Sequence, residues 1–111
     1  MPFQLERMDS VFKEGRGGVG GAGPLPSEIA RGRIYGCIFD DLVGLKQRDD
    51  VGIDQILFET DYPHSDGTFP HSRKVAHSMF AAVGMNAEES YKVLRGNAIE
   101  AYGLQRFGIT K

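Results

Sequence analysis

The sequence predicts an α/β fold, on the basis of three observations. Short apolar runs at residues 34–39 and 55–59 are typical of buried strands. Helical periodicity precedes, separates and follows these two runs. Because strands that alternate with helices favour parallel βα units, the runs are expected to pair in parallel. Two parallel strands leave both sheet edges open, so we expect them to belong to a larger sheet.

Helices are expected before and between the strands. Apolar residues recur three and four apart over residues 2–13, and residues 26–30 read as a short helical turn. Asp41 is predicted to cap a helix over 42–48, because its carboxylate can accept from free backbone N–H groups. We prefer this interpretation to one in which Asp40 and Asp41 form an acid–base pair.

Three further helices are expected after the second strand. Residues 72–83 carry apolar side chains on one side. Two Asn–Glu pairs have the spacing of a capping box, in which each side chain satisfies a backbone N–H of the other residue. These pairs are Asn86 with Glu89 and Asn97 with Glu100. Gly103 is expected to end the last helix.

Residues 14–26 are rich in glycine and proline and are predicted to form a mobile loop. A phosphate-binding loop requires a strand–turn–helix context, but no strand precedes this segment, no Lys-Ser/Thr follows it, and prolines close it. We therefore do not expect phosphate to bind there.

Composition excludes several classes of protein. The chain has 111 residues, which fits one domain over 1–111, and its net charge of −2 does not favour a nucleic-acid partner. Cys37 is the single cysteine, so no internal disulfide can form; we expect a buried small hydrophobe rather than a catalytic thiol. We expect no signal peptide, and no apolar run approaches the roughly 18 residues of a membrane span. A soluble, cytoplasmic protein is the expectation.

The residues that could carry chemistry lie just after the second strand. Ligands gather at the carboxyl ends of parallel strands, and Asp61 is expected one or two residues past such a strand. Spacing alone leaves Asp61 equally a functional carboxylate and a turn or cap residue. For His64 we favour a structural hydrogen bond or a solvent position over metal ligation, and for Asp66 and His71 a turn and a helix start. A metal site made of Asp61, His64 and His71 alone matches no motif of fixed geometry.

These residues also carry a family resemblance. Residues 57–66 and 69–72 resemble the eighth-strand region of amidohydrolase-related proteins, in the branch that includes aminocarboxymuconate-semialdehyde decarboxylase. The similar segments that surround them are residues 3–9, 25–28, 35–41, 95–98 and 102–103. The most specific strings are Asp61-Tyr62-Pro63-His64 and Arg95-Gly96-Asn97-Ala98.

The resemblance implies a partial (β/α)8 TIM barrel, comprising about its last two βα units and the C-terminal helices. It implies that Asp61 is a ligand of a divalent metal, with zinc expected in the full-length family, and also transfers protons. His64 would lie at the rim of the substrate site. The implied activity is hydrolysis or decarboxylation of a small carboxylic or cyclic substrate.

The sequence departs from this family in what precedes Asp61. His64 is its first histidine, so it has no His-x-His or Glu-x-His motif before the strand. A complete barrel needs roughly 200 residues or more. We therefore expect the C-terminal portion of an enzyme, inactive in isolation and without a tightly bound metal. The alternative is a non-catalytic fragment that associates with itself or with a complementary barrel chain through exposed apolar surface.

Overall fold

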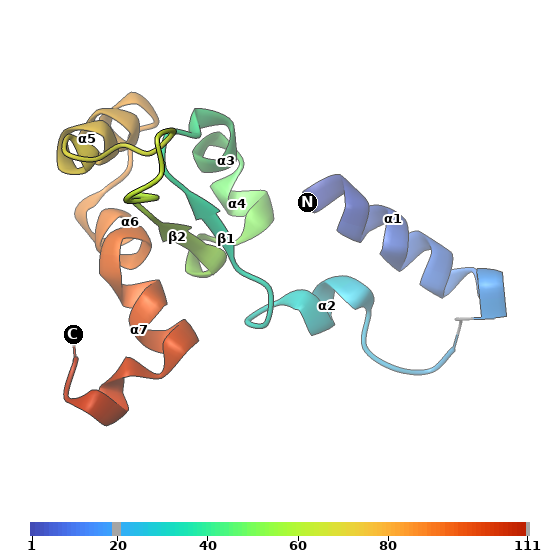
Figure 1. Ribbon diagram of the computed structural model, residues 1–111. Helices are drawn as coiled ribbons and strands as arrows, with labels where there is room; N and C mark the ends of the chain where they lie inside the picture. Colours follow the sequence, from blue (N-terminus) through green and yellow to red (C-terminus); the bar gives the residue numbers. More distant parts are fainter. Residues whose placement is uncertain (19–20, 111) are drawn as a thin grey trace. The chain divides into compact units, whose positions relative to one another are not determined.

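The computed structural model describes residues 1–18 and 21–110, which divide into two compact units, Met1–Ile34 and Tyr35–Lys111 (Figure 1). The N-terminal unit contains helix α1 (Pro2–Lys13), a 3₁₀ turn (Arg16–Gly18) and helix α2 (Pro26–Ala30). Both predicted helices of this unit are confirmed. Residues 21–25 have no helix or strand, as predicted, whereas Val19 and Gly20 lie outside the described residues.

The two helices of the N-terminal unit are joined by one carboxylate. Asp9 of α1 accepts hydrogen bonds from the backbone N–H of Ser27 at 2.9 Å and from its hydroxyl at 2.6 Å. These bonds hold the pKa of Asp9 below its ordinary value. Ala30 is the one buried hydrophobic residue among the described residues of this unit, and Phe3 stays 73% exposed. The unit therefore has almost no core of its own.

The C-terminal unit is built on two parallel strands, as predicted. Strand β1 (Gly36–Ile38) pairs with β2 (Ile56–Phe58) in the register Gly36↔Ile56, Cys37↔Leu57 and Ile38↔Phe58. The Glu59 N–H donates to the Ile38 carbonyl at 2.9 Å and continues the ladder by one bond. Both strands are shorter than predicted. The Phe39 N–H turns to the Asp41 carboxylate, and Gln55 belongs to a 3₁₀ turn (Ile53–Gln55).

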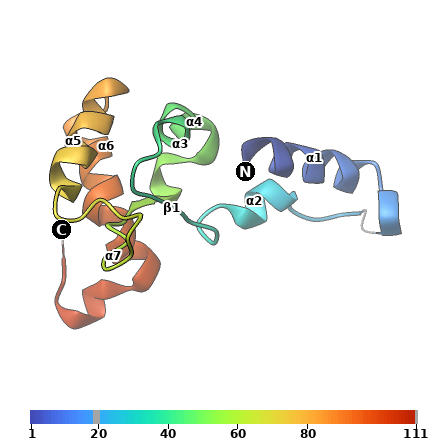
Figure 2. The same cartoon turned by 45° about the horizontal axis from the view of Figure 1, so that its top comes forward.

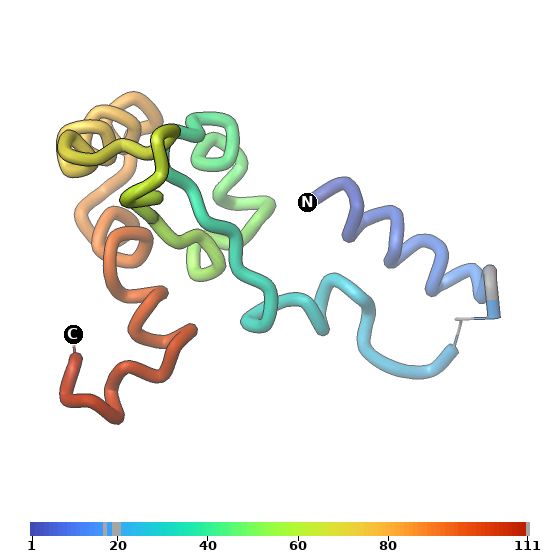
Figure 3. Tube along the Cα trace, viewed as in Figure 1, coloured from blue at the N-terminus to red at the C-terminus, as the bar shows by residue number. Residues whose placement is uncertain are grey.

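Helices flank the strands in all views. Helices α3 (Leu42–Lys46) and α4 (Arg48–Val51) lie beside β1, and α6 (Ala87–Tyr91) and α7 (Asn97–Tyr102) lie beside β2 (Figures 1 and 2). The chain trace runs from β2 through a long loop into α5 (Ser72–Ala82), as Figure 3 shows. A π-helical turn (Lys92–Gly96) joins α6 to α7, and a 3₁₀ turn (Leu104–Phe107) follows. No helix among the described residues has the length and apolar character needed to cross a membrane.

One face of the sheet packs on the helices. The buried core cluster comprises Ile38, Leu45, Ile56, Ala76, Met79, Phe80 and Val93. Neighbouring residues of a strand point to opposite faces, so Cys37 points away from the face that Ile38 presents to the cluster. Cys37 is exposed, and the prediction of a buried cysteine was wrong. A strand buried on both faces was also the wrong expectation for β1, because only Ile38 of its three residues is buried.

The predicted caps have mixed outcomes. The Asn86–Glu89 capping box is confirmed, with reciprocal bonds of 2.9 Å each, and Gly103 ends α7 in the left-handed conformation. Asp41 occupies the N-cap position of α3, but its side chain bonds Phe39 rather than the helix. The helix predicted over 42–48 is divided at Gln47 into α3 and α4.

Asn97 is not a helix cap, and that prediction was wrong. The chain enters α7 directly from the π-helical turn, so the N–H groups there already have helical partners. The Asn97 side chain is buried and donates to the carbonyls of Ile53 and Ile56, at 2.7 Å each. It therefore ties α7 to the segment that leads into β2.

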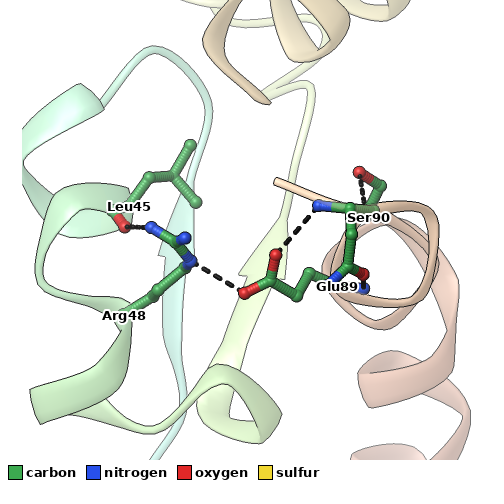
Figure 4. Close-up of polar contacts among 5 residues, drawn as sticks. Leu45, Arg48, Glu89 and Ser90 are labelled. Atoms are coloured by element: carbon green, nitrogen blue, oxygen red, sulfur yellow. Dashed lines mark hydrogen bonds and ion pairs between the residues drawn. The ribbon is translucent and has the colours of Figure 1, made fainter. Parts of the chain in front are cut away.

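A second tie joins α4 to α6. Arg48 Nε lies 2.9 Å from the Glu89 carboxylate, and the Arg48 guanidinium also donates to the Leu45 carbonyl at 3.2 Å (Figure 4). Glu89 uses its other carboxylate oxygen for the capping box with Asn86. Helices α4 and α6 are thereby connected directly through side chains.

Candidate active site at the end of strand β2

The loop that follows β2 is closed on itself by backbone hydrogen bonds. The Thr68 N–H donates to the Thr60 carbonyl at 3.1 Å and closes the base of the loop. Inside it, the His64 N–H donates to the Asp61 carbonyl at 2.8 Å, and the Gly67 N–H donates to the His64 carbonyl at 3.2 Å. Asp61 thus lies at the beginning of an ordered turn, three residues beyond the end of β2.

Asp61 has an unusual backbone conformation. Its φ of 54° makes it the one non-glycine residue with a left-handed backbone among those that the structure describes. Asp tolerates this region better than most residues, and the conformation still costs about 1 kcal/mol. The surrounding hydrogen bonds hold the residue there, and strained backbone of this kind is concentrated at functional sites.

Gly67 allows the turn to close. A Cβ atom at this position would lie 2.6 Å from the Thr60 carbonyl oxygen and 3.1 Å from that of Asp61. Both obstructing atoms are backbone atoms, so a larger residue would have to displace the segment that carries Asp61. Sequence reasoning did not single out Gly67, although a glycine after Asp66 is a recognised turn signal.

The carboxylate of Asp61 contacts the side chain of His64. His64 Nδ1 lies 3.2 Å from Asp61 Oδ2, and the two side chains are 68% and 41% exposed. The imidazole can donate a hydrogen bond to the carboxylate, and when protonated it forms an ion pair with it. The two residues that the sequence selected for this site therefore lie together, and both are open to solvent.

The same loop carries two aromatic rings that contact each other. Tyr62 and Phe69 have ring centroids 4.6 Å apart with an interplanar angle of 59°, and both are largely exposed. Each precedes a proline across a cis peptide bond. The loop thus presents a carboxylate, an imidazole and two aromatic faces at the carboxyl end of β2.

A second acidic side chain lies at the same strand end. The Glu59 carboxylate accepts a hydrogen bond from the Cys37 thiol, and the partial desolvation of this exposed side chain together with the negative neighbour raises the pKa of Cys37. Cys37 is therefore held as a thiol rather than as a reactive thiolate. Glu59 was not among the site residues predicted from the sequence, although its position at the end of a strand is the signal that also led to Asp61.

The residues present do not form a complete metal site. Nowhere in residues 1–18 and 21–110 do three or more His, Cys, Asp or Glu side chains gather closely enough to hold a metal ion. Structural zinc sites use four protein ligands and catalytic sites commonly three, whereas Asp61 and His64 provide two donors at most. Asp66, His71 and His77 do not join them.

The fold and the loop together define an α/β protein with a candidate site at the carboxyl ends of parallel strands, which is where such folds bind their ligands. The amidohydrolase family model matches residues 45–104, from α3 through β2 and the Asp61 loop to the beginning of the last turn. The match spans more than half of the chain, and the protein belongs to the amidohydrolase family. No curated protein matches the sequence.

Proposed function

We propose that this chain is the part of a metal-dependent amidohydrolase-family enzyme that contributes Asp61 to the active site. The observation that carries the proposal is the position of Asp61, which lies within the family match and at the carboxyl end of a parallel strand. Its left-handed backbone and the closed turn around it support a functional role, because such strain persists only where the surroundings enforce it.

The finer assignment rests on the family resemblance. In it, β1 and β2 are the last two strands of a (β/α)8 barrel of the decarboxylase-like branch, and the substrate is a small carboxylic or cyclic compound. The enzyme would be a hydrolase or a carbon–carbon lyase. Asp61 would be a metal ligand that also holds and transfers a proton, and His64 would lie at the substrate rim.

The donor set has a direct consequence for the chain alone. The family generally uses a divalent metal, of which zinc is our proposal here, but the described residues offer fewer donors than such a site needs. The remaining ligands would come from outside the described residues. The isolated chain is therefore proposed to be inactive and to bind no metal tightly.

A reconstitution experiment tests this function. An amidohydrolase barrel that lacks its corresponding C-terminal segment is mixed with this chain, and turnover of the barrel's own substrate is measured. The wild-type chain should restore activity. Asp61→Asn should not, because Asn tolerates the same left-handed backbone but lacks the charge. Asp66→Asn, from the same loop, is the matched control and should restore activity; equal rescue by all three would contradict the role of Asp61.

A second candidate function is association without catalysis. Within the described residues each strand has one neighbouring strand only, so no further strand covers either outer edge of the sheet. Several large apolar side chains are also exposed in the C-terminal unit, including Val43 at 68% and Phe107 at 68%. Such surface favours a homo-oligomer or binding to a complementary barrel chain. Light scattering after size-exclusion chromatography distinguishes these states, and a compact monomer with a cooperative melt would count against self-association.

A further inference from the structure

A cavity of about 580 Å³ lies between helix α5 and the segment that joins β1 to α3. Its size falls within the range of small-molecule sites, roughly 300–1,000 Å³. One wall is a stripe along α5 that includes Lys74, Val75, Ser78 and Met79, at the spacing of one helix face. Asp40 and Leu42 form the other wall, where the chain leaves β1.

The cavity opens at the edge of the sheet where ligands are expected. Asp40 follows the carboxyl end of β1, and α5 begins after the loop that follows the carboxyl end of β2. Crevices outside the carboxyl ends of parallel strands are the usual binding places of open α/β sheets. Asp61 does not line this cavity, so a ligand here would not depend on the metal role proposed for Asp61.

The cavity lining includes one carboxylate and one ammonium group, beside the imidazole of His71, and these two charged groups are not paired with each other. Asp40 and Lys74 have opposite charges and both line the cavity, yet no ion pair joins them and neither side chain has a hydrogen-bond partner within the described part of the chain. The hydroxyl of Ser78 likewise has no partner there. Leu42, Val75 and Met79 supply apolar surface beside these groups. A carboxylate and an ammonium group thus line one partly apolar space, and both residues are exposed to solvent and available to a ligand.

We propose that this cavity binds a free amino acid with an aliphatic side chain. The ligand carboxylate would pair with Lys74 and its ammonium group with Asp40, while its side chain would pack on Leu42, Val75 and Met79. One cation and one anion at separate positions complement a zwitterion. A simple anion would meet the Asp40 carboxylate, and a simple cation would meet the Lys74 ammonium.

A titration of the ¹⁵N-labelled full chain with L-leucine tests the proposal, read from amide chemical shifts. Saturable shifts are expected at the cavity residues. Two probes each lack one charge: 4-methylpentanoate has no ammonium group and 3-methylbutylamine has no carboxylate. Each should bind about tenfold or more weakly, the equivalent of losing one charged contact. Binding of either probe as tight as that of leucine would overturn the proposal, as would the absence of saturable shifts with leucine.

Variants separate the cavity from the rest of the surface. Asp40→Asn and Lys74→Met should each weaken leucine binding about tenfold or more, for the same reason. Asp50→Asn and Lys46→Met are matched controls, since both residues are exposed and neither lines the cavity. Unchanged affinity in both cavity variants, with the fold intact by circular dichroism, would contradict the proposed contacts. Equal loss in the control variants would do the same.

Discussion

His64 Nδ1 lies 3.2 Å from Asp61 Oδ2, across a turn in which the His64 backbone N–H also donates to the Asp61 carbonyl at 2.8 Å. The side-chain contact is exposed to water, whereas the backbone bond is part of the closed loop. Solvent screening makes exposed ion pairs weak contributors to stability. The loop should therefore keep Asp61 in place without the imidazole.

The first prediction concerns His64. Replacing it with alanine should change the free energy of unfolding by less than about 1 kcal/mol, because an exposed pair contributes little and the backbone bond remains. Urea unfolding at neutral pH measures this difference. A larger loss would show that the side chain, rather than the backbone, holds the turn.

Gly67→Ala should distort the loop that carries Asp61. The added Cβ would lie 2.6 Å from the Thr60 carbonyl oxygen, so the backbone must move, at an expected loss of about 1–3 kcal/mol. Amide spectra should show shifts concentrated at the Asp61 loop. Gly44→Ala is the control, since its Cβ would meet Ile38 Cγ2 at an ordinary 3.6 Å within α3. Spectra in which Gly67→Ala perturbs the loop no more than Gly44→Ala does would contradict this role.

Asn97→Ala should lower the free energy of unfolding more than Asn86→Ala does. It removes both donors to the buried carbonyls of Ile53 and Ile56, which predicts a loss of about 2–3 kcal/mol. Asn86→Ala removes a helix cap and should cost about 1 kcal/mol. Thermal and urea unfolding of both variants provide the comparison. If Asn86→Ala were the less stable variant, the Asn97 hydrogen bonds would not make the larger contribution to stability.

Lowering the pH should weaken the ion pair between Arg48 of α4 and Glu89 of α6. The Arg48 guanidinium, helped by the Asn86 N–H, holds the pKa of Glu89 below its ordinary value of 4.5. A carboxyl group whose folded pKa is lowered contributes stability above the unfolded pKa and loses that contribution as pH falls through the folded value. Unfolding free energies measured from pH 6 downward should therefore fall below about pH 4.5. Glu89→Gln should flatten this decline, whereas Glu100→Gln, at an exposed position, should follow the wild type.

Local sequence patterns predicted the elements of this fold and failed where distant partners decide a residue's role. The period of α1, the capping box at Asn86 and the parallel pairing of the strands all follow from nearby residues. Asn97 has the spacing of a cap, but its partners are carbonyls more than forty positions earlier, and no local pattern reports them. The exposure of Cys37 likewise depends on which face of the sheet the helices cover.

In the candidate site, too, the role that a local pattern indicates was predicted, and the roles that depend on distant residues were missed. Asp61 was selected because it follows a buried strand, and the family match now spans it. The support around it was not predicted, because Gly67 matters through a carbonyl oxygen seven residues earlier in the chain. Glu59 was missed because its contact with Cys37 requires the register of the two strands.

The central claim is that Asp61 is one ligand of a metal site whose other ligands do not belong to this chain. Zinc binding by the purified chain tests this claim most directly. The chain and its Asp61→Asn variant are dialysed against buffered zinc, and the metal content of each is measured. Our account predicts that neither protein retains stoichiometric zinc and that the two do not differ. One tightly bound zinc per wild-type chain, lost in Asp61→Asn, would contradict it.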